Sequence, residues 1–233
     1  MSKHTLIFGL SADPLHSGHI AVVTGACQAL LARGYELAQV LLVPVYRRNP
    51  VGDPKEDLPK TYHHRLAMCR IGAAILQDNL KTAGVPVTAS AIEETLVRDT
   101  TRPNYTVLTL EALRRNAAAD TELCLLISSD LVSGEEPELC RWYRPLHLVR
   151  LAALAIAPRP GASPNMDFIT ALRGCGAEII YLDEMQTPDI SSRQIRARLL
   201  SGGKPAALAH TGLLPKVVAA YITAQGLYKK NET

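Results

Sequence analysis

Long apolar runs, paired cysteines and a strong net charge are all missing from this sequence of 233 residues. No segment approaches the ~18–20 apolar residues that a membrane-spanning helix needs, so we expect no membrane partner. The formal net charge is only +3, which is too small to indicate binding to nucleic acid. The residues from Met1 to His4 lead directly into an apolar segment and contain no signal-peptide core.

The five cysteines are widely scattered, and none belongs to a Cys-x-x-Cys pair. This spacing suggests neither a disulfide framework nor a zinc site. Cys27, Cys69 and Cys124 lie in apolar segments and are predicted to be small core residues. A reducing, cytoplasmic location is therefore expected.

Short apolar segments alternate with helical patterns through most of the chain. The composition is 47% hydrophobic and 20% charged, and the length favours one domain over residues 1–233, with a C-terminal helical part at about 186–228. Strands are expected at Thr5–Gly9, Gln39–Pro44, Pro86–Ser90, Glu122–Ser128, Leu151–Ala157 and Glu178–Leu182. Helices are expected at about Gly18–Arg33, Tyr62–Gln77, Tyr105–Asn116, Asn165–Cys175, Ser191–Leu200 and Leu214–Gln225.

This alternation predicts an α/β fold with a Rossmann-like, doubly wound parallel sheet that helices cover on both faces. Ligands of such sheets bind beyond the carboxyl ends of the strands, near a topological switch point. We therefore expect the functional site in the loops after the first, second and fourth strands.

A loop closed by two histidines follows the first predicted strand. It runs from Phe8 to His19 and reads Phe-Gly-Leu-Ser-Ala-Asp-Pro-Leu-His-Ser-Gly-His. A helix is expected to begin at its end, so free backbone N–H groups and the positive end of the helix dipole meet there. His16 and His19 could hold a triphosphate and stabilise charge during phosphoryl or nucleotidyl transfer. The alternative is that a histidine here only caps the helix or lies on the surface.

A second anion cradle is predicted in the segment from Asp189 to Arg196. Ser191 is a favourable N-cap, and Ser192, Arg193 and Arg196 follow in the first turns of the helix. Taken alone, the pattern fits a capped surface helix with solvated arginines equally well.

The segment from Val45 to Lys60 is long, polar and interrupted by proline and glycine. It follows the second strand, so we interpret it as a flap over bound phosphates, with plain disorder as the alternative. The basic side chains that it offers to a phosphate are Arg47, Arg48, Lys55 and Lys60.

The two cradles resemble the two signatures of the nucleotidyltransferase superfamily. The first is Gly-Gly-Ser/Thr-Phe-Asp-Pro-x-His-x-Gly-His, which this chain matches except at Leu10 and Ala12. Leucine adopts positive φ less readily than glycine, so these departures bear on the shape of the loop but not on its histidine chemistry. The second is Ile-Ser-Ser-Thr-x-Ile-Arg, with Arg193 in place of the threonine. The usual Pro-Pro-His-Lys run after the second strand is missing.

Further segments resemble the bacterial nicotinate-mononucleotide adenylyltransferases. Arg102 to Leu110 is similar to their Ser-Tyr-Thr-x-x-Thr-Leu segment, where the Tyr-Thr turn binds the nicotinate carboxylate. Leu125 to Leu131 is similar to their Ile-Gly-x-Asp turn near the nucleotide sugar, with Ser128 in place of the glycine. Ala157 to Gly161 is similar to their Arg-Arg-Pro-Gly segment beside the adenine. Trp142 is close to the position of an aromatic residue against the pyridine ring.

The resemblance implies transfer of AMP from ATP to nicotinate mononucleotide, giving deamido-NAD and pyrophosphate. Mg²⁺ is implied as a cofactor bound through the ATP phosphates, since nothing in the sequence resembles a dedicated metal site. The implied catalytic residues are His16, His19 and Arg196, and the implied ATP-binding residues add Gly9, Leu10, Ser11, Gly18, Asp130, Arg159, Ser191 and Ser192. The implied acceptor-binding residues are Asp13, Arg47, Tyr105, Thr106 and Trp142.

Some readings stay open. Tyr105, Thr106 and Trp142 could instead serve as a core aromatic, an N-cap and a core tryptophan, respectively. Arg65 matches a family arginine, and Tyr221 to Tyr228 resembles the closing helix and tail; both are interpreted as structural. The acceptor could be nicotinamide mononucleotide, phosphopantetheine, or a phosphorylated sugar or alcohol. A relative of the class I aminoacyl-tRNA synthetases would need a Lys-Met-Ser-Lys-Ser-type loop and RNA-binding domains, and neither is visible in this sequence. The alternative from a different functional class is a nucleotide sensor without catalytic activity.

Overall fold

The computed structural model describes residues 2–47, 58–98 and 103–229. Its centre is a sheet of six parallel strands in the order β3-β2-β1-β4-β5-β6. The strands are β1 (Lys3–Leu10), β2 (Glu36–Pro44), β3 (Val87–Ala89), β4 (Thr121–Ser128), β5 (Ala153–Ala157) and β6 (Ile179–Tyr181). The strand order reverses between β1 and β4, and this doubly wound order confirms the predicted fold class.

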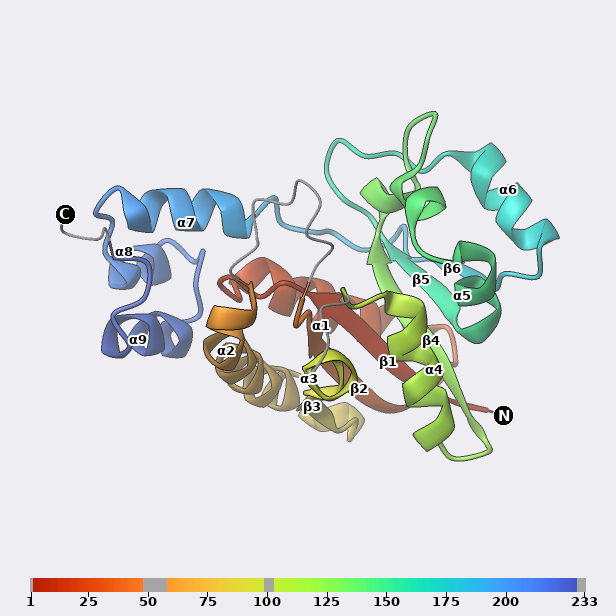
Figure 1. Cartoon of the computed structure of the whole chain (residues 1–233), viewed down its shortest axis with the longest axis horizontal. Coiled ribbons are helices and arrows are strands. Elements are labelled where there is room, and N and C mark those ends of the chain that lie inside the picture. The colour runs from red at the N-terminus through yellow and green to blue at the C-terminus, as the bar shows by residue number, and fades with distance from the viewer. Residues whose placement is uncertain (1, 48–57, 99–102, 230–233) are drawn as a thin grey trace.

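Helices cover both faces of the sheet (Figure 1). They are α1 (Ser17–Ala32), α2 (Leu58–Asn79), α3 (Ile92–Val97), α4 (Thr106–Asn116), α5 (Pro145–Leu151), α6 (Met166–Gly174), α7 (Ser192–Leu200), α8 (Pro205–His210) and α9 (Lys216–Ala224). Short 3₁₀ turns lie at Lys81–Ala83, Ser129–Val132 and Glu138–Arg141.

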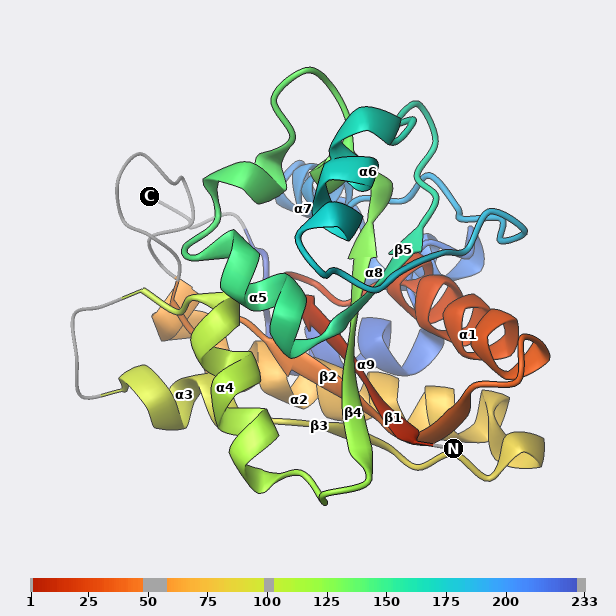
Figure 2. The ribbon, with the colours of Figure 1, turned by 90° about the vertical axis from the view of Figure 1, so that its right-hand side faces the viewer.

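Successive residues of β1 enter opposite halves of the core, because side chains alternate along a strand. Leu6 belongs to a buried cluster that includes residues of α1, α2 and the C-terminal helices. Ile7 belongs to a second cluster with residues of α4, α5 and α6, and Figure 2 shows α4 and α5 on the side of the sheet opposite α1. The uninterrupted apolar run of β4, Leu123–Ile127, is buried throughout, as expected for a strand covered on both faces.

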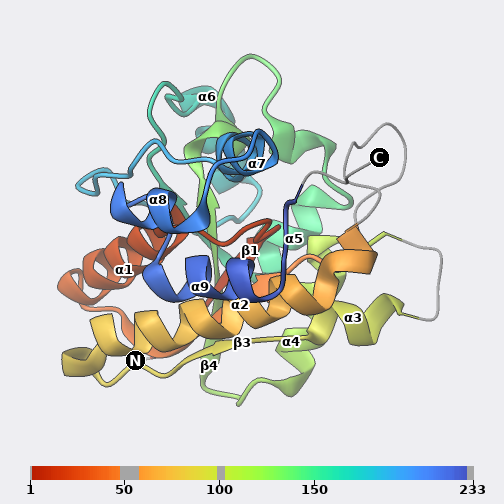
Figure 3. The same cartoon turned by 90° about the vertical axis from the view of Figure 1, so that its left-hand side faces the viewer.

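The C-terminal helices belong to the same core as the sheet. Ile195 of α7, Leu208 of α8 and Ile222 of α9 are buried in the cluster that contains Leu6. Helix α9 packs against α2, as Figure 3 shows. The loop after β1 therefore has the C-terminal helices as near neighbours.

All six predicted strands are present, but the fifth begins later than expected. Leu151 is the last residue of α5, and β5 starts at Ala153. The apolar run continues from helix into strand, so hydrophobicity alone does not mark the boundary. Helices α3, α5 and α8 were not predicted, since segments of six or seven residues are too short to show a helical period. No helix within the described ranges has the length and apolar character to cross a membrane.

Candidate active site

The two histidines form a stacked pair at the start of α1. His16 is the N-cap residue of α1, and its ring lies 3.6 Å from that of His19, centroid to centroid, at an interplanar angle of 26°. The backbone N–H of His16 donates a hydrogen bond of 3.1 Å to Nδ1 of His19. The proton of a neutral His19 ring is therefore on Nε2, which is left as a hydrogen-bond donor.

Burial keeps both imidazoles neutral. It lowers the pKa of His16 from 6.5 to about 4, with a second contribution from the positive charge of Arg159. Burial, and next the neighbouring His16, lower the pKa of His19 well below 6.5. Nδ1 of His16 is buried without a hydrogen-bond partner among the described residues. The pair thus presents uncharged rings to any ligand that approaches.

Gly18 is required by the close approach of the His16 ring. A Cβ atom at Gly18 would lie 3.0 Å from Nδ1 of His16 and 3.2 Å from Cβ of Ile190. At Gly9, by contrast, an added Cβ would meet nothing within 4 Å, and the residue is exposed. Gly9 therefore leaves an open approach to the backbone at the end of β1, as a phosphate needs.

The unusual backbone conformation of the loop is at Ala12 and not at Leu10. Leu10 is buried and pairs with Pro44 as the last residue of β1, so this position does not require the freedom of glycine. Ala12 has a φ of +52° and is followed by a cis peptide bond between Asp13 and Pro14. Of the two positions that depart from the signature, Ala12 therefore has the positive φ and Leu10 does not.

The second cradle lies against the first. Ser191 is the N-cap of α7, and its hydroxyl accepts a hydrogen bond of 3.3 Å from the N–H of Gln194. The hydroxyl of Ser192 donates to the carbonyl oxygen of Pro14 at 3.0 Å. Arg196 donates to the carbonyl oxygen of Asp13, and its Nη1 lies 3.4 Å from the Asp13 carboxylate. The fold therefore brings the two signature segments together, although about 180 residues separate them.

Arg65 of α2 supports the loop from below. Its side chain is fully buried, and Nη1 donates to the carbonyl oxygens of Ser11 at 2.8 Å and Val45 at 2.7 Å. The guanidinium carbon of Arg65 lies over the ring of Tyr62, 5.4 Å from its centroid. Arg65 therefore joins the loops that follow β1 and β2, in line with its interpretation as structural.

Asp130 and Arg159 lie together at the ends of β4 and β5. Nη1 of Arg159 is 2.9 Å from a carboxylate oxygen of Asp130, and the hydroxyl of Ser128 donates to the other oxygen. The backbone N–H of Arg159 donates to the buried hydroxyl of Ser129 at 2.9 Å. The residues that the resemblance assigned to the sugar and the adenine thus form one group.

Three aromatic residues lie at or before the starts of α4 and α5. Tyr105 is the N-cap of α4 and Thr106 its first residue. The ring of Tyr105 lies 4.5 Å from that of Tyr143, which is 48% exposed. Trp142 is partly buried against the apolar cluster of α4, α5 and α6. Tyr143, which sequence reasoning missed, therefore pairs with Tyr105, and the proposed contact of Trp142 with a ligand stays a prediction.

Arg47 places the base of the predicted flap beside α4. Its N–H donates to Oδ1 of Asn104 at 2.8 Å, and the N–H of Asn104 donates to the carbonyl of Arg47 at 2.8 Å. The buried carboxylate of Glu93 accepts the N–H of Tyr46 at 3.0 Å and the hydroxyl of Thr109 at 3.2 Å. Sequence analysis missed Glu93. Arg48, Lys55 and Arg102 lie outside the described residues, as does the side chain of Lys60.

Comparison with known proteins identifies the family of this chain. A protein of Sodalis glossinidius described as a probable nicotinate-nucleotide adenylyltransferase is 34% identical to this chain, over 97% of both. A protein of the same description from Gemmatimonas aurantiaca is 31% identical, over 96% of this chain and 92% of its own. This chain belongs to the nicotinate-nucleotide adenylyltransferase family. No protein-family model matches it.

Solved structures of the family share the fold. The nicotinic acid mononucleotide adenylyltransferase of Plasmodium falciparum complexed with NaAD superimposes with a TM-score of 0.67 and 17% sequence identity, over 97% of each chain. The same enzyme complexed with APC gives a TM-score of 0.68 at 16% identity. At this level of identity, the likeness concerns the architecture of the family alone.

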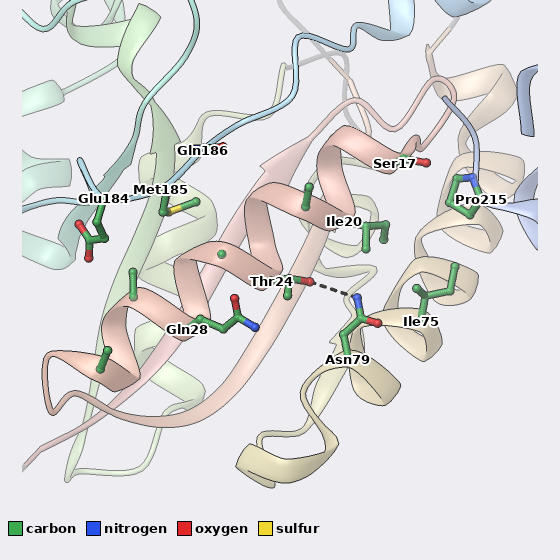
Figure 4. Close-up of a pocket in the computed structure, with 14 residues that line it drawn as sticks. Ser17, Ile20, Thr24, Gln28, Ile75, Asn79, Glu184, Met185, Gln186 and Pro215 are labelled. Carbon is green, nitrogen blue, oxygen red and sulfur yellow. Dashed lines mark hydrogen bonds between the residues drawn. The ribbon is translucent and has the colours of Figure 1, made fainter. Parts of the chain in front are cut away.

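The chain also has a groove that is lined by residues of α1 and α2 and not by the histidine pair. It has a volume of about 770 Å³ and runs along the outer face of α1 toward α2, as Figure 4 shows. Thr24, Gln28, Asn79, Met185 and Pro215 are among the residues that line it. Neither histidine of the pair lines the groove, although Ser17, the first residue of α1, does. Within the described ranges, no three His, Cys, Asp or Glu side chains gather as metal ligands would.

Proposed function

We propose that this chain transfers AMP from ATP to nicotinate mononucleotide, releasing pyrophosphate and forming deamido-NAD. The observation that carries the proposal is the meeting of the His16–His19 pair with the start of α7, through Ser192 and Arg196. Two helix N-termini, two imidazoles and a guanidinium at one sheet edge make a site for a polyanion. Membership of the family supports the choice of substrates.

The phosphate of the mononucleotide attacks the α-phosphorus of ATP in line, and pyrophosphate leaves. A phosphate monoester is already anionic near neutral pH, so the step needs no general base, and catalysis depends on positioning and on stabilisation of charge. The Nε2–H of His19 donates to the reacting phosphate, while His16 packs beside it and faces the ATP phosphates. Backbone amides of Gly9 to Ser11 hold the phosphates that react, and Ser192 and Arg196 hold the pyrophosphate.

ATP would bring Mg²⁺ with it, and the metal would supply neutralisation of part of the phosphate charge. Asp130 and Arg159 take the sugar and the adenine, and the start of α4 at Tyr105 and Thr106 takes the nicotinate carboxylate. Arg47 and Trp142 complete the acceptor side, whereas Asp13 acts through Arg196, whose Nη1 lies 3.4 Å from the Asp13 carboxylate. The chain acts in the cytoplasm, on ATP and nicotinate mononucleotide.

Pyrophosphate release tests the proposal. ATP and Mg²⁺ are incubated with the enzyme and with nicotinate mononucleotide or nicotinamide mononucleotide in parallel. Strong release with the acid and little with the amide is expected. Equal rates would contradict the proposed carboxylate site, and no release with either would contradict the choice of acceptor.

His19→Ala separates an enzyme from a nucleotide sensor. We expect this variant to lose turnover by about 100-fold or more while ATP affinity changes by less than about 10-fold, because the His19 donor acts most strongly on the transition state. Loss of binding together with activity would contradict this assignment. Calorimetric titration with ATP measures the affinity.

A further inference from the structure

Three residues from distant parts of the chain meet beside the histidine loop. The hydroxyl of Tyr228, near the C-terminus, donates a hydrogen bond of 2.7 Å to Oδ1 of Asp13. Oδ2 of the same carboxylate lies 3.4 Å from Nη1 of Arg196. Both charged side chains are largely buried, with exposed fractions of 16% for Asp13 and 22% for Arg196. Asp13 therefore joins the tail of the chain to the arginine of α7.

The backbone of Tyr228 is held in an unfavourable conformation to make this contact. Its φ is +59°, in the left-handed region that aromatic residues rarely adopt. The segment beyond α9 packs against the apolar cluster that contains Leu6, with Leu227 and Tyr228 as its partners. A strained residue persists only where its surroundings fix it, and such residues concentrate at functional sites. The strain at Tyr228 thus points to the hydroxyl that it delivers.

The charges of this group determine which partner donates. Burial, and next the charge of Asp13, raise the pKa of Tyr228 above its ordinary value of 10.0, so the hydroxyl stays protonated at any pH used in an assay. It can then only donate to Asp13, and the carboxylate is held from both sides by Tyr228 and Arg196. Arg196 is in turn fixed by the backbone carbonyl of Asp13. Loss of the Tyr228 hydroxyl would let the carboxylate turn away from Arg196, and the guanidinium would keep only its bond to the backbone carbonyl of Asp13.

We propose that Tyr228 is a positioning residue for the transfer of AMP: through Asp13 it holds Arg196 where the departing pyrophosphate is bound. This inference rests on the proposed function. It goes beyond the interpretation of Tyr221 to Tyr228 as a structural tail, because it assigns the hydroxyl an effect on one side of the reaction. The groove of Figure 4 carries no comparable inference, since nothing in the structure shows what covers it.

Tyr228→Phe removes the hydroxyl and keeps the ring. We expect kcat/KM for ATP to fall by about 10- to 100-fold, which is the effect of one hydrogen bond to a charged group. Inhibition by pyrophosphate should weaken to a similar degree, whereas KM for the acceptor should change less than about twofold. In an Asp13→Ala background, Tyr228→Phe should have no further effect on kcat/KM for ATP.

Tyr221→Phe is the matched control. Tyr221 lies on α9, and its hydroxyl makes a hydrogen bond of 2.9 Å with Nδ1 of His64, away from Asp13. Tyr221→Phe also removes a tyrosine hydroxyl from the C-terminal part of the chain, so an effect on folding alone would appear in both variants. We expect its kinetics to equal those of the wild type.

Calorimetric titration of ATP into each variant separates this inference from the proposed function, because it does not depend on the acceptor. Weaker ATP binding by Tyr228→Phe alone is expected even if the acceptor is wrongly assigned. Equal ATP affinity and equal kcat/KM in Tyr228→Phe and the wild type would overturn the role of Tyr228. An equal loss in Tyr221→Phe, or a loss shared evenly by both substrates, would overturn it as well.

Discussion

Burial makes the histidine pair costly to protonate. The pKa of His16 falls from 6.5 to about 4 because the ring is buried and lies near Arg159. In the unfolded chain the same ring binds its proton at 6.5, so between these values the unfolded state holds more protons than the folded state. The contribution of His16 to the free energy of unfolding is therefore fully present above about pH 6.5, and it is lost as the pH falls toward 4.

At this residue we predict that the free energy of unfolding depends on pH differently in the wild type and in His16→Asn. For the wild type, His16 should lower the free energy of unfolding by at most about 3 kcal/mol between pH 7 and pH 4. His16→Asn should flatten that part of the profile, because asparagine does not titrate. Urea unfolding at several pH values measures both curves, and parallel curves would show that His16 is exposed to protonation in the folded state.

Gly18→Ala tests how closely the His16 ring must pack. The new methyl group would lie 3.0 Å from Nδ1 and 3.1 Å from Cε1 of His16, so the ring must shift by a few tenths of an ångström. We expect kcat to fall by about 10-fold, since small displacements of catalytic groups are costly. The steric strain and the gain in helix propensity offset each other, so stability should change by less than about 2 kcal/mol.

Gly174→Ala is the matched substitution, because a Cβ atom there meets nothing within 4 Å and Gly174 ends α6, outside the candidate site. Its kcat should equal that of the wild type. Equal kcat in Gly18→Ala would mean that the His16 ring can move without consequence.

At the scale of elements, α3 joins the segments that we propose to bind the acceptor. Glu93 holds the base of the flap through the N–H of Tyr46 and holds α4 through Thr109. Its backbone carbonyl also accepts Nδ2 of Asn104 at 3.0 Å. Three segments thus depend on one helix of six residues, although none of its side chains was expected to contribute.

Glu93→Gln should therefore affect the acceptor more than ATP. One carboxylate oxygen becomes an N–H₂ group that faces a donor, which should cost about 1–3 kcal/mol of stability. We expect KM for nicotinate mononucleotide to rise by about 10-fold while KM for ATP stays within about twofold. Steady-state kinetics with each substrate varied in turn measure this difference.

Glu94→Gln is the control on the same helix. Glu94 pairs with Arg98, four residues away on the surface, and such pairs contribute only about 0.3–0.5 kcal/mol. If Glu94→Gln and Glu93→Gln raise KM for the acceptor equally, the effect belongs to α3 as a whole and not to the buried carboxylate.

The elements that sequence reasoning found are those with a strong local pattern. The apolar runs of β1 and β4 mark buried strands, and Ser191 marks the start of α7 because its hydroxyl can cap the helix locally. The pairing of Tyr105 with Tyr143 could not be inferred this way, since it depends on how α4 and the turn before α5 pack. The contact of Trp142 with a ligand stays a prediction, because Trp142 is partly buried against the apolar cluster of α4, α5 and α6.

At the scale of the whole molecule, the site depends on both ends of the chain. The histidine loop follows β1, whereas Ser192, Arg196 and Tyr228 come from the last helices and the tail. Motif resemblance assigned residues of both cradles to one ATP site, but it could not predict that Asp13 lies between Tyr228 and Arg196. Contacts of this separation are set by packing of the C-terminal helices against α2 and by the shared apolar cluster.

A ligand that contacts both parts should stabilise the entire fold. At about 100 times its Kd, a non-hydrolysable ATP analogue should add about 2.7 kcal/mol to the free energy of unfolding. For a chain of this size, that corresponds to a rise in Tm of roughly 5–10 °C. Arg196→Ala should lose more than half of this shift at the same ligand concentration, because the analogue no longer bridges the loop and α7.

Arg198→Ala removes an exposed arginine from the same helix and should keep the full shift. Differential scanning calorimetry of the three proteins, with and without the analogue, makes the comparison. If Arg196→Ala kept the full shift, the phosphates would be held by the histidine loop and α1 alone. The two signatures would then meet to support the loop, through Asp13 and Pro14, and α7 would have no direct part in binding ATP.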